Sequence, residues 1–341
     1  MTEAPPTLEI NPPLINSSNP WATTLEDLRA LYAHPSTGAV TTRTSLIKGF
    51  GHDPAKHCYV FFDPATHSSS LNPDPIHAGL TQNASLNSLG YSPLTLEQYL
   101  GFIKTISDEQ TTPSSKGFIV SVTGTPEEVA DSYKLIASAK LAVNFPLVME
   151  VNLSCPNIPN KPPPAYSRDA LVQYLEKLQD TINTHHELPR IPFGLKTPPY
   201  THLTEYQKLI GALESSAESS AGGVSPVSFL TSTNTLGSCL VISDIPGTFA
   251  LPGYGIGGMA GAPLHPLALG NVATLRRMLD EDERSGKLGH IRIIGIGGVL
   301  DVIGYRRMRS VGAAIVGVGT GLGLKGVGIF GEIETALEGQ W

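Results

Sequence analysis

Short apolar runs recur along the chain and alternate with longer segments of helical periodicity. Strands of a parallel sheet are buried on both faces, so they read as continuous apolar runs and not as alternating ones. Eight runs fit this description. The predicted strands cover residues 14–18, 39–43, 118–123, 147–154, 193–197, 228–233, 291–296 and 313–318.

The segments between these runs carry the signals of helices. Leu171, Tyr174, Leu175 and Leu178 lie on one face of a helix predicted over 167–184. A threonine N-cap followed by proline opens another helix at residue 125. The other predicted helices cover residues 24–33, 94–106, 204–214 and 265–279. Eight strands separated mostly by helices predict one α/β domain over 1–341, a (β/α)8 TIM barrel, with a doubly wound open sheet as the alternative.

Three segments do not fit the alternation. Residues 49–92 follow the second strand without a clear period and are rich in His, Pro, Asn and Ser. A connection this long is unusual in a compact domain, and it predicts an extended loop or lid insertion, or small hairpins. The small residues of 215–226 predict a surface loop, and the glycines of 253–261 predict a second loop.

Polar residues cluster where the predicted strands end. In a TIM barrel these ends open on one face, where the active site lies. The residues concerned are Ser18, Arg43, Cys155, Lys196, Asn234, Gly297 and Gly319.

The stretch 147–162, LVMEVNLSCPNIPNKP, concentrates this chemistry. It starts as a buried strand, and Pro156 and Pro159 prevent that strand from continuing past Ser154. Two carboxamides and a thiol thus reach a loop stiffened by proline. A reaction site explains this composition better than packing does.

Glycines follow the last two strands. Gly297 and Gly298 come after the seventh, and Gly319 precedes Thr320 after the eighth. Backbone N–H groups at glycines can approach a phosphate closely, and barrels often bind phosphate at these two loops. Each turn alone is typical of an ordinary glycine turn, but the pair favours a phosphate site.

Three further residues have both a functional and a structural interpretation. Cys155 is either a catalytic thiol or a buried small hydrophobe. Lys196 ends an apolar strand, where an unpaired buried ammonium is costly, unless its side chain reaches water. The same reasoning applies to Arg43 with weaker context.

Four asparagines, Asn87, Asn152, Asn157 and Asn234, are each typical of turns. Together they predict a carboxamide-lined pocket. Each amide offers a donor and an acceptor, which suits a planar ligand with imide and carboxylate edges.

Composition excludes several classes of protein. The net charge is −7 and no basic block exists, which argues against nucleic-acid binding. Cys58, Cys155 and Cys239 are widely spaced, so we expect neither a disulfide framework nor a metal site, and we expect a reducing, cytoplasmic location. The first residues lack the pattern of a secretory signal, and the glycine-rich stretch 311–330 contains Lys325, so no membrane segment is expected.

The stretch 150–166, EVNLSCPNIPNKPPPAY, resembles the signature of class 1 dihydroorotate dehydrogenases, and most closely that of the class 1A group. Five further motifs match in the family's order, and the resemblance covers about residues 11–337. These are LNSLG at 86–90, GLKTPPY at 194–200, GIGGMAGAPLHPLALGNV at 255–272, IIGIGGV at 293–299 and VGVGTGL at 316–322.

The resemblance implies an FMN enzyme that oxidises dihydroorotate to orotate in pyrimidine biosynthesis. Cys155 would take the proton of substrate C5 while hydride passes from C6 to flavin N5, and Lys196 would lie against the flavin ring. Electrons would then pass to fumarate, in a homodimer that needs no membrane. Substrate contacts are expected from Asn87, Asn152, Asn157, Asn234 and Thr235. Cofactor contacts are expected from Ser18, Lys196, Gly257, Gly258, Gly297, Gly298, Gly319 and Thr320.

The chain departs from the family at several positions. Arg43 stands where the family has a lysine near flavin and substrate, and Thr231 stands where an asparagine is usual. Ser238 and Cys239 replace an Asn-Gly pair, and the 49–83 and 215–226 segments differ. These changes keep two alternatives open: a diverged flavin paralogue acting on another small cyclic or α,β-unsaturated substrate, and a non-enzymatic barrel that binds FMN or a metabolite.

Overall fold

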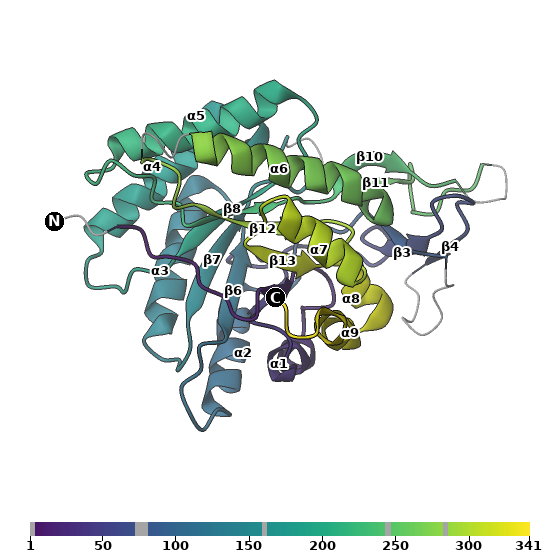
Figure 1. Ribbon diagram of the computed structural model, residues 1–341, viewed down its shortest axis with the longest axis horizontal. Coiled ribbons are helices and arrows are strands. Elements are labelled where there is room, and N and C mark those ends of the chain that lie inside the picture. Colours follow the sequence, from purple (N-terminus) through teal and green to yellow (C-terminus); the bar gives the residue numbers. More distant parts are fainter. Residues whose placement is uncertain (1–3, 72–80, 159–161, 243–246, 282–285) are drawn as a thin grey trace.

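Eight parallel strands close into a barrel in the computed structural model, which describes residues 4–71, 81–158, 162–242, 247–281 and 286–341 (Figure 1). Around the ring the order is β1-β13-β12-β9-β8-β7-β6-β2. The first strand pairs with the last, with Ile15 opposite Gly317, and also with the second, with Ile15 opposite Ala39. An open sheet would leave β1 or β13 at an edge, so the predicted TIM barrel is confirmed and the doubly wound alternative is wrong.

Each predicted strand is present within a few residues of its expected ends. The barrel strands are β1 (Leu14–Asn16), β2 (Ala39–Thr41), β6 (Gly117–Val122), β7 (Leu147–Asn152), β8 (Phe193–Thr197), β9 (Phe229–Ser232), β12 (Arg292–Ile296) and β13 (Ile315–Val318). The helices are α1 (Leu25–Ala33), α2 (Leu96–Asp108), α3 (Pro126–Lys140), α4 (Arg168–Thr184), α5 (Leu203–Ser219), α6 (His265–Glu281), α7 (Val302–Ser310), α8 (Thr320–Lys325) and α9 (Gly328–Leu337). Two short 3-10 turns, η2 (Pro164–Tyr166) and η3 (Ala262–Leu264), precede α4 and α6.

Side-chain caps explain where several helices begin. Thr24, Thr95 and Thr125 each accept a hydrogen bond from the backbone N–H three residues later and form a capping box. The α5 helix runs to Ser219, so the predicted loop over 215–226 is wrong for its first five residues. Ala212, Leu213, Ser216 and Ala217 are buried there, which extends the helix into a stretch whose small residues resemble a loop. No helix in the described ranges is both long and apolar enough to cross a bilayer.

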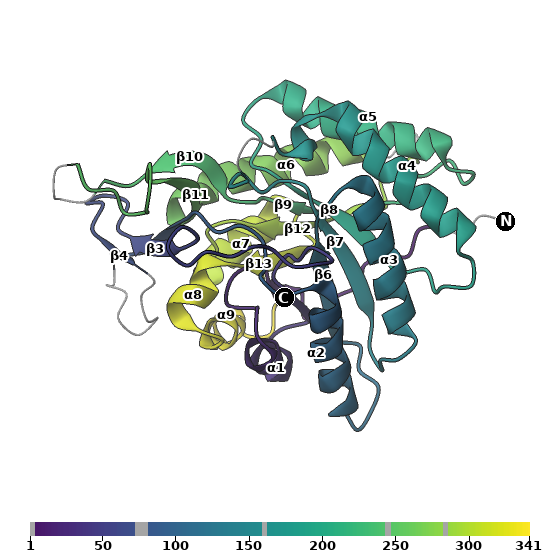
Figure 2. The ribbon, with the colours of Figure 1, turned by 180° about the vertical axis from the view of Figure 1, so that it is seen from behind.

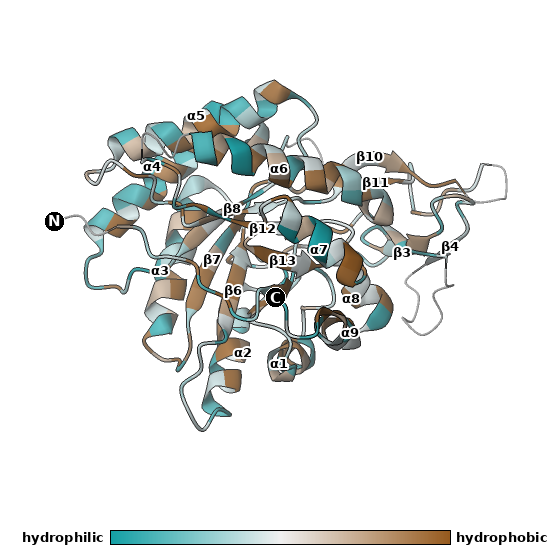
Figure 3. Cartoon of the chain, in the orientation of Figure 1, coloured by the Kyte–Doolittle hydropathy of each residue, from teal (hydrophilic) through white to brown (hydrophobic). Residues whose placement is uncertain are grey.

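The apolar residues of the barrel form two concentric layers, and a third cluster lies in the second sheet. Nine side chains, including Ile15, Ile119, Phe229 and Ile294, fill the barrel interior. A larger cluster lies between the strands and the surrounding helices. In Figure 3 the barrel strands are mostly brown, whereas the helices around them carry teal on their outer surfaces. The interior cluster closes one end of the barrel, and polar residues remain at the other.

A second sheet projects to one side of the barrel (Figures 1 and 2). It is antiparallel, with the order β10-β11-β5-β3-β4. Its strands are β3 (Tyr59–Phe62), β4 (Ser69–Leu71), β5 (Ala84–Asn87), β10 (Leu236–Leu240) and β11 (Ile256–Gly261). The described part of 49–92 therefore contains strands, and its action as a lid stays a prediction. The predicted glycine loop at 253–261 is wrong for its last six residues, which form β11.

Candidate active site

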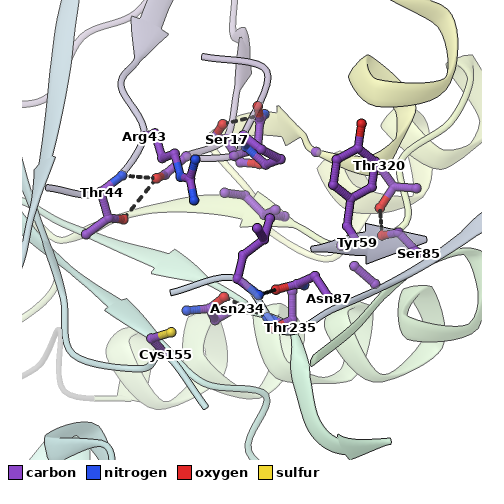
Figure 4. Close-up of a pocket in the computed structure, with 18 of the residues that line it drawn as sticks. Ser17, Arg43, Thr44, Tyr59, Ser85, Asn87, Cys155, Asn234, Thr235 and Thr320 are labelled. Atoms are coloured by element: carbon purple, nitrogen blue, oxygen red, sulfur yellow. Dashed lines mark hydrogen bonds between the residues drawn. The ribbon is translucent and has the colours of Figure 1, made fainter. Parts of the chain in front are cut away.

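A cavity lies at the carboxyl ends of the barrel strands, beside the second sheet (Figure 4). All predicted site residues except Gly257 and Gly258 line it. These are Ser18, Arg43, Asn87, Asn152, Cys155, Asn157, Lys196, Asn234, Thr235, Gly297, Gly298, Gly319 and Thr320.

Cys155 lies in the loop after β7 and is partly exposed to this cavity. Burial raises the pKa of its thiol above the ordinary value. Three groups act in the opposite direction: the backbone N–H of Asn157, which donates to the sulfur, and the positive charges of Lys196 and Arg43. The site therefore supplies local stabilisation for a thiolate, which a thiol needs in order to act as a base.

Lys196 is in β8, directly across from Asn152 in β7, and only 4% of its surface is exposed. It has no hydrogen bond or ion pair to another described residue. An ammonium buried without a partner is costly, so this charge favours an anionic or electron-rich ligand in the cavity.

Arg43 follows β2 and points into the same cavity, on the side of Cys155 and opposite Tyr59 and Thr320 (Figure 4). One guanidinium nitrogen donates to the carbonyl of Tyr91 at 3.3 Å. Burial lowers the pKa of this guanidinium below its ordinary value, while the Tyr99 and Cys155 side chains act to raise it. Most of its donors remain available for a ligand.

The four asparagines form two linked pairs. Asn234 donates to the Oδ1 of Asn152 at 3.2 Å and to the hydroxyl of Ser154 at 3.0 Å. Asn157 donates to the Oδ1 of Asn87 at 2.9 Å. These bonds fix the carboxamide planes before any ligand binds, which is what a planar ligand requires of its site.

Two glycine turns form the rim of the cavity. Gly297 and Gly298 have φ values of +132° and +67°, and a Cβ at Gly298 would lie 2.6 Å from the carbonyl oxygen of Gly261. A Cβ at Gly319 would lie 3.0 Å from the Ser17 hydroxyl. The backbone here is close-packed and can expose N–H groups to an anion, as a phosphate cradle requires.

The glycine turns fit the phosphate of FMN, and a second feature of the cavity also fits this cofactor. Thr233 lines the cavity, and its buried hydroxyl has no hydrogen-bond partner. Lys196 and Thr233 thus place an ammonium and a hydroxyl in the cavity wall, and neither has a hydrogen-bond partner among the described residues. Such groups are expected where a polar ring system binds.

Gly257 and Gly258, predicted as cofactor contacts, lie in β11 and do not line the cavity. A Cβ at Gly257 would lie 2.5 Å from the backbone oxygen of Asn87, and the Gly258 carbonyl accepts a hydrogen bond from the Asn87 side chain at 3.0 Å. Close packing of β11 on β5 therefore explains Gly257, whereas a Cβ at Gly258 would lie 2.2 Å from the Thr235 hydroxyl. Their predicted contact with the cofactor has no support in this geometry.

Several lining residues were missed from the sequence. Tyr59 and Ser85 come from the second sheet, and the Ser85 hydroxyl lies 2.8 Å from that of Thr320. Thr44 links Asn152 to Ser121 through hydrogen bonds of 2.9 Å each. Thr44 follows Arg43 directly after a predicted strand, so its position in the sequence could have predicted that it lines the cavity. Nothing in the sequence near Tyr59 predicted a role in the site.

A TIM barrel with a glycine-rich rim, a buried ammonium and a thiol at its strand ends defines a ligand-binding barrel equipped for proton transfer. The family model for dihydroorotate dehydrogenase matches residues 64–340. The chain belongs to the dihydroorotate dehydrogenase family.

Curated relatives match almost the whole chain. The dihydroorotate dehydrogenase A (fumarate) of Lactococcus lactis is 28% identical over 327 residues, covering 96% of this chain and 89% of the relative. The dihydroorotate dehydrogenase (fumarate) of Trypanosoma brucei is 28% identical over 333 residues, covering 97% and 90%. That of Trypanosoma cruzi is 29% identical over 329 residues, covering 95% and 88%.

Proposed function

We propose that this chain oxidises dihydroorotate to orotate with FMN, in the manner expected of class 1A enzymes. One observation carries the proposal: Cys155, Lys196 and the four asparagines, which come from the ends of β5, β7, β8 and β9, line one cavity beside a glycine-rich rim. Family membership supports the substrate, because the relatives are named for it.

FMN supplies the acceptor for hydride when it is bound. The Gly297, Gly298 and Gly319 turns, with Thr320, would hold its phosphate through backbone N–H groups and a hydroxyl. Lys196 and the unpartnered Thr233 hydroxyl would contact its ring system. A cation beside the ring favours the reduced, negatively charged form.

The protein's own part in the reaction is to hold the ring of the substrate and to move one proton. Asn87, Asn152, Asn157 and Asn234 would bind the imide and carboxylate edges, with Thr235 assisting. The Cys155 thiolate would take the proton from C5 as hydride leaves C6. Lys196 and Arg43 would stabilise the thiolate before transfer.

We propose fumarate as the electron acceptor. We also propose a homodimer, which light scattering would test.

Arg43 supports the alternative proposal, a diverged flavin paralogue that acts on another small cyclic or α,β-unsaturated substrate. A guanidinium is planar and bulkier than the family's ammonium, and it binds carboxylates with two parallel hydrogen bonds. A diverged paralogue acting on another small unsaturated acid would use this same fork.

Anaerobic titration of the yellow protein with dihydroorotate tests the proposal. We expect the flavin absorbance to bleach and fumarate to restore it. Flavin that dihydroorotate does not bleach, but another unsaturated or cyclic acid does, would support the paralogue. Protein that binds FMN and reacts with neither would support a non-enzymatic barrel.

A further inference from the structure

Glu150 is a buried carboxylate that the proposed reaction does not use. It lies in β7, and only 1% of its surface is exposed. Val148, two residues earlier, belongs to the cluster that fills the barrel interior, and Asn152, two residues later, lines the cavity. Because side chains alternate along a strand, Glu150 faces the interior between these two. Among the described residues, Glu150 and Lys196 are the only buried Asp, Glu, Lys or Arg side chains.

A chain of hydrogen bonds connects Glu150 to the cavity. Its Oε1 atom accepts from the Ser121 hydroxyl at 2.8 Å. The Ser121 and Thr44 hydroxyls lie 2.9 Å apart, and the Asn152 side-chain amide donates to the Thr44 hydroxyl at 2.9 Å. Asn152 in turn accepts from the Asn234 side chain at 3.2 Å. Thr44, Asn152 and Asn234 line the cavity, and Thr44 and Asn234 appear in its wall in Figure 4.

The first member of this chain sets the direction of the others. A carboxylate only accepts hydrogen bonds, so the single hydroxyl proton of Ser121 is committed to Glu150. The Ser121 oxygen then accepts from Thr44, which uses the hydroxyl proton of Thr44. The Thr44 oxygen is left as an acceptor for the Asn152 amide. Asn152 is thereby held with one N–H towards Thr44, and its other N–H is available to a ligand oxygen.

One other contact favours the same orientation of Asn152. The backbone N–H of Ser154 donates to the Asn152 Oδ1 atom at 3.3 Å. The usual N–H···O distance is about 2.7–3.2 Å, so this bond is weak. A neutral amide in place of Glu150 donates as well as accepts, which allows the chain to run in either direction. The Asn152 carboxamide would then lose its strongest constraint.

We propose that Glu150 is a positioning residue, which acts through Ser121 and Thr44 to orient the Asn152 carboxamide for the ring of the substrate. The inference rests on the proposed function and adds a residue to it. The charge of Glu150 acts in the opposite direction, because orotate is itself a carboxylate and like charges repel. Glu150 therefore aids binding only through the hydrogen-bonded chain.

Spectral titration of the bound flavin with orotate tests the proposal. Glu150→Gln keeps the shape of the side chain and removes its charge, whereas Ser121→Ala keeps the charge and breaks the chain. We expect each variant to raise the Kd of orotate about threefold to tenfold, the effect of one misplaced hydrogen bond. The double variant should raise the Kd no more than the larger single effect, because both residues act on one chain.

Ser132→Ala is the matched control. Ser132 is as fully buried as Ser121, but its hydroxyl donates to the Glu128 carbonyl within α3, at 2.7 Å. We expect its Kd for orotate to equal that of the wild type. This variant separates the chain from a general effect of removing a buried hydroxyl.

Several outcomes overturn the proposal. A lower Kd in Glu150→Gln would show that the carboxylate acts by its charge alone, and an unchanged Kd would show that it has no role in binding. An unchanged Kd in Ser121→Ala would show that the chain does not carry the effect. Single increases that multiply in the double variant, or an equal increase in Ser132→Ala, would contradict a shared path.

Failure of the proposed function gives a different result, because orotate then leaves the flavin spectrum of the wild type unchanged. The chain is in that case tested without substrate, by NMR of protein that carries isotope-labelled asparagine. The Asn152 side-chain signal is identified by its loss in Asn152→Ala. We expect its amide protons to exchange with solvent about threefold or more faster in Glu150→Gln and Ser121→Ala than in the wild type and Ser132→Ala. Equal exchange rates in all four proteins would contradict the proposal.

Discussion

The Nδ2 atom of Asn157 lies 2.9 Å from the Oδ1 atom of Asn87, which joins the loop after β7 to the end of β5. The same amide is also within 2.8 Å of the Leu89 carbonyl and 3.2 Å of the Asn87 carbonyl. One carboxamide of the barrel thus holds the C-terminal end of β5, the central strand of the second sheet. The contact connects two parts of the cavity wall that lie 70 residues apart in sequence.

Asn157→Ala removes this connection and is expected to weaken orotate binding. Each hydrogen bond contributes about 0.5–1.5 kcal/mol, so we expect the Kd of orotate to rise about tenfold or more. FMN content should not change, because the glycine rim is intact. Spectral titration of bound flavin measures the Kd. Asn144→Ala, at an exposed position, is the control. An equal rise in the Kd for that variant would contradict a specific role of Asn157 in orotate binding.

Cys155→Ala should retain FMN and reduce it about 10²- to 10⁴-fold more slowly, because general-base catalysis contributes about that much. Anaerobic stopped-flow bleaching by dihydroorotate measures the rate. Cys239→Ala is the matched control, since Cys239 lies in β10 and does not line the cavity. Reduction of Cys155→Ala at the wild-type rate would show that another group is the base.

The rate of flavin reduction should rise with pH. The active form of Cys155 is the thiolate, and burial raises the pKa of the thiol. The pH at which the rate is half-maximal should therefore lie above the ordinary cysteine pKa of about 8.5. Arg43 lowers this pKa through its charge. Arg43→Gln should therefore move the rising limb to higher pH. A shift to lower pH would contradict the predicted role of Arg43.

Gly298→Ala should lower FMN content and destabilise the protein. Its φ of +67° is unfavourable for alanine, and the new Cβ would lie 2.6 Å from the Gly261 carbonyl oxygen and from the His265 Cβ. We expect about 1–3 kcal/mol less stability by denaturant unfolding. Gly270→Ala is the control. It lies inside α6 with nothing within 4 Å of its Cβ, so it should be neutral or stabilising.

Lys116 holds the C-terminal end of α1. Its ammonium donates to the His34 carbonyl at 2.7 Å, the Leu31 carbonyl at 3.3 Å and the Thr37 hydroxyl at 2.6 Å, and it lies 5.3 Å from the centre of the Tyr32 ring. Lys116→Met should reduce the free energy of unfolding by about 1–3 kcal/mol. Lys104→Met, in an exposed pair with Asp108, should change it by less than about 1 kcal/mol.

The same lysine should make stability depend on pH. Burial lowers the pKa of Lys116 to about 8, from 10.5. Between these values the unfolded chain binds more protons than the folded one, so this group favours the folded state increasingly as pH rises. The stability difference between wild type and Lys116→Met should therefore widen from pH 7.5 to pH 10. A constant or narrowing difference would contradict the lowered pKa.

The barrel was predictable from sequence because its strands are buried on both faces. Runs such as 118–123 and 291–296 are mostly apolar, and the order of the runs was enough to predict the closed ring. The residues at their ends, Cys155 and Lys196 among them, lie together as expected. Strand periodicity thus located most of the cavity.

The second sheet was not predictable by the same reasoning. The β11 strand, IGGMAG, resembles a loop in sequence because three of its six residues are glycines, although a Cβ at Gly257 would lie 2.5 Å from the Asn87 carbonyl oxygen of β5. The β5 strand, ASLN, is short and pairs with strands distant in sequence. No local sequence pattern therefore predicted that Tyr59 and Ser85 line the cavity.

The pairing of β5 with β11 also limits which substitutions the two strands can accept. Asn87 lies opposite Gly258, and Leu86 opposite Met259. A larger residue in one segment needs a smaller one in the other, although about 170 positions separate the hydrogen-bonded pair of Asn87 and Gly258. Across descendants of this chain, the two segments should therefore covary, and a graft of either segment alone from a relative should misfit at the mouth of the cavity.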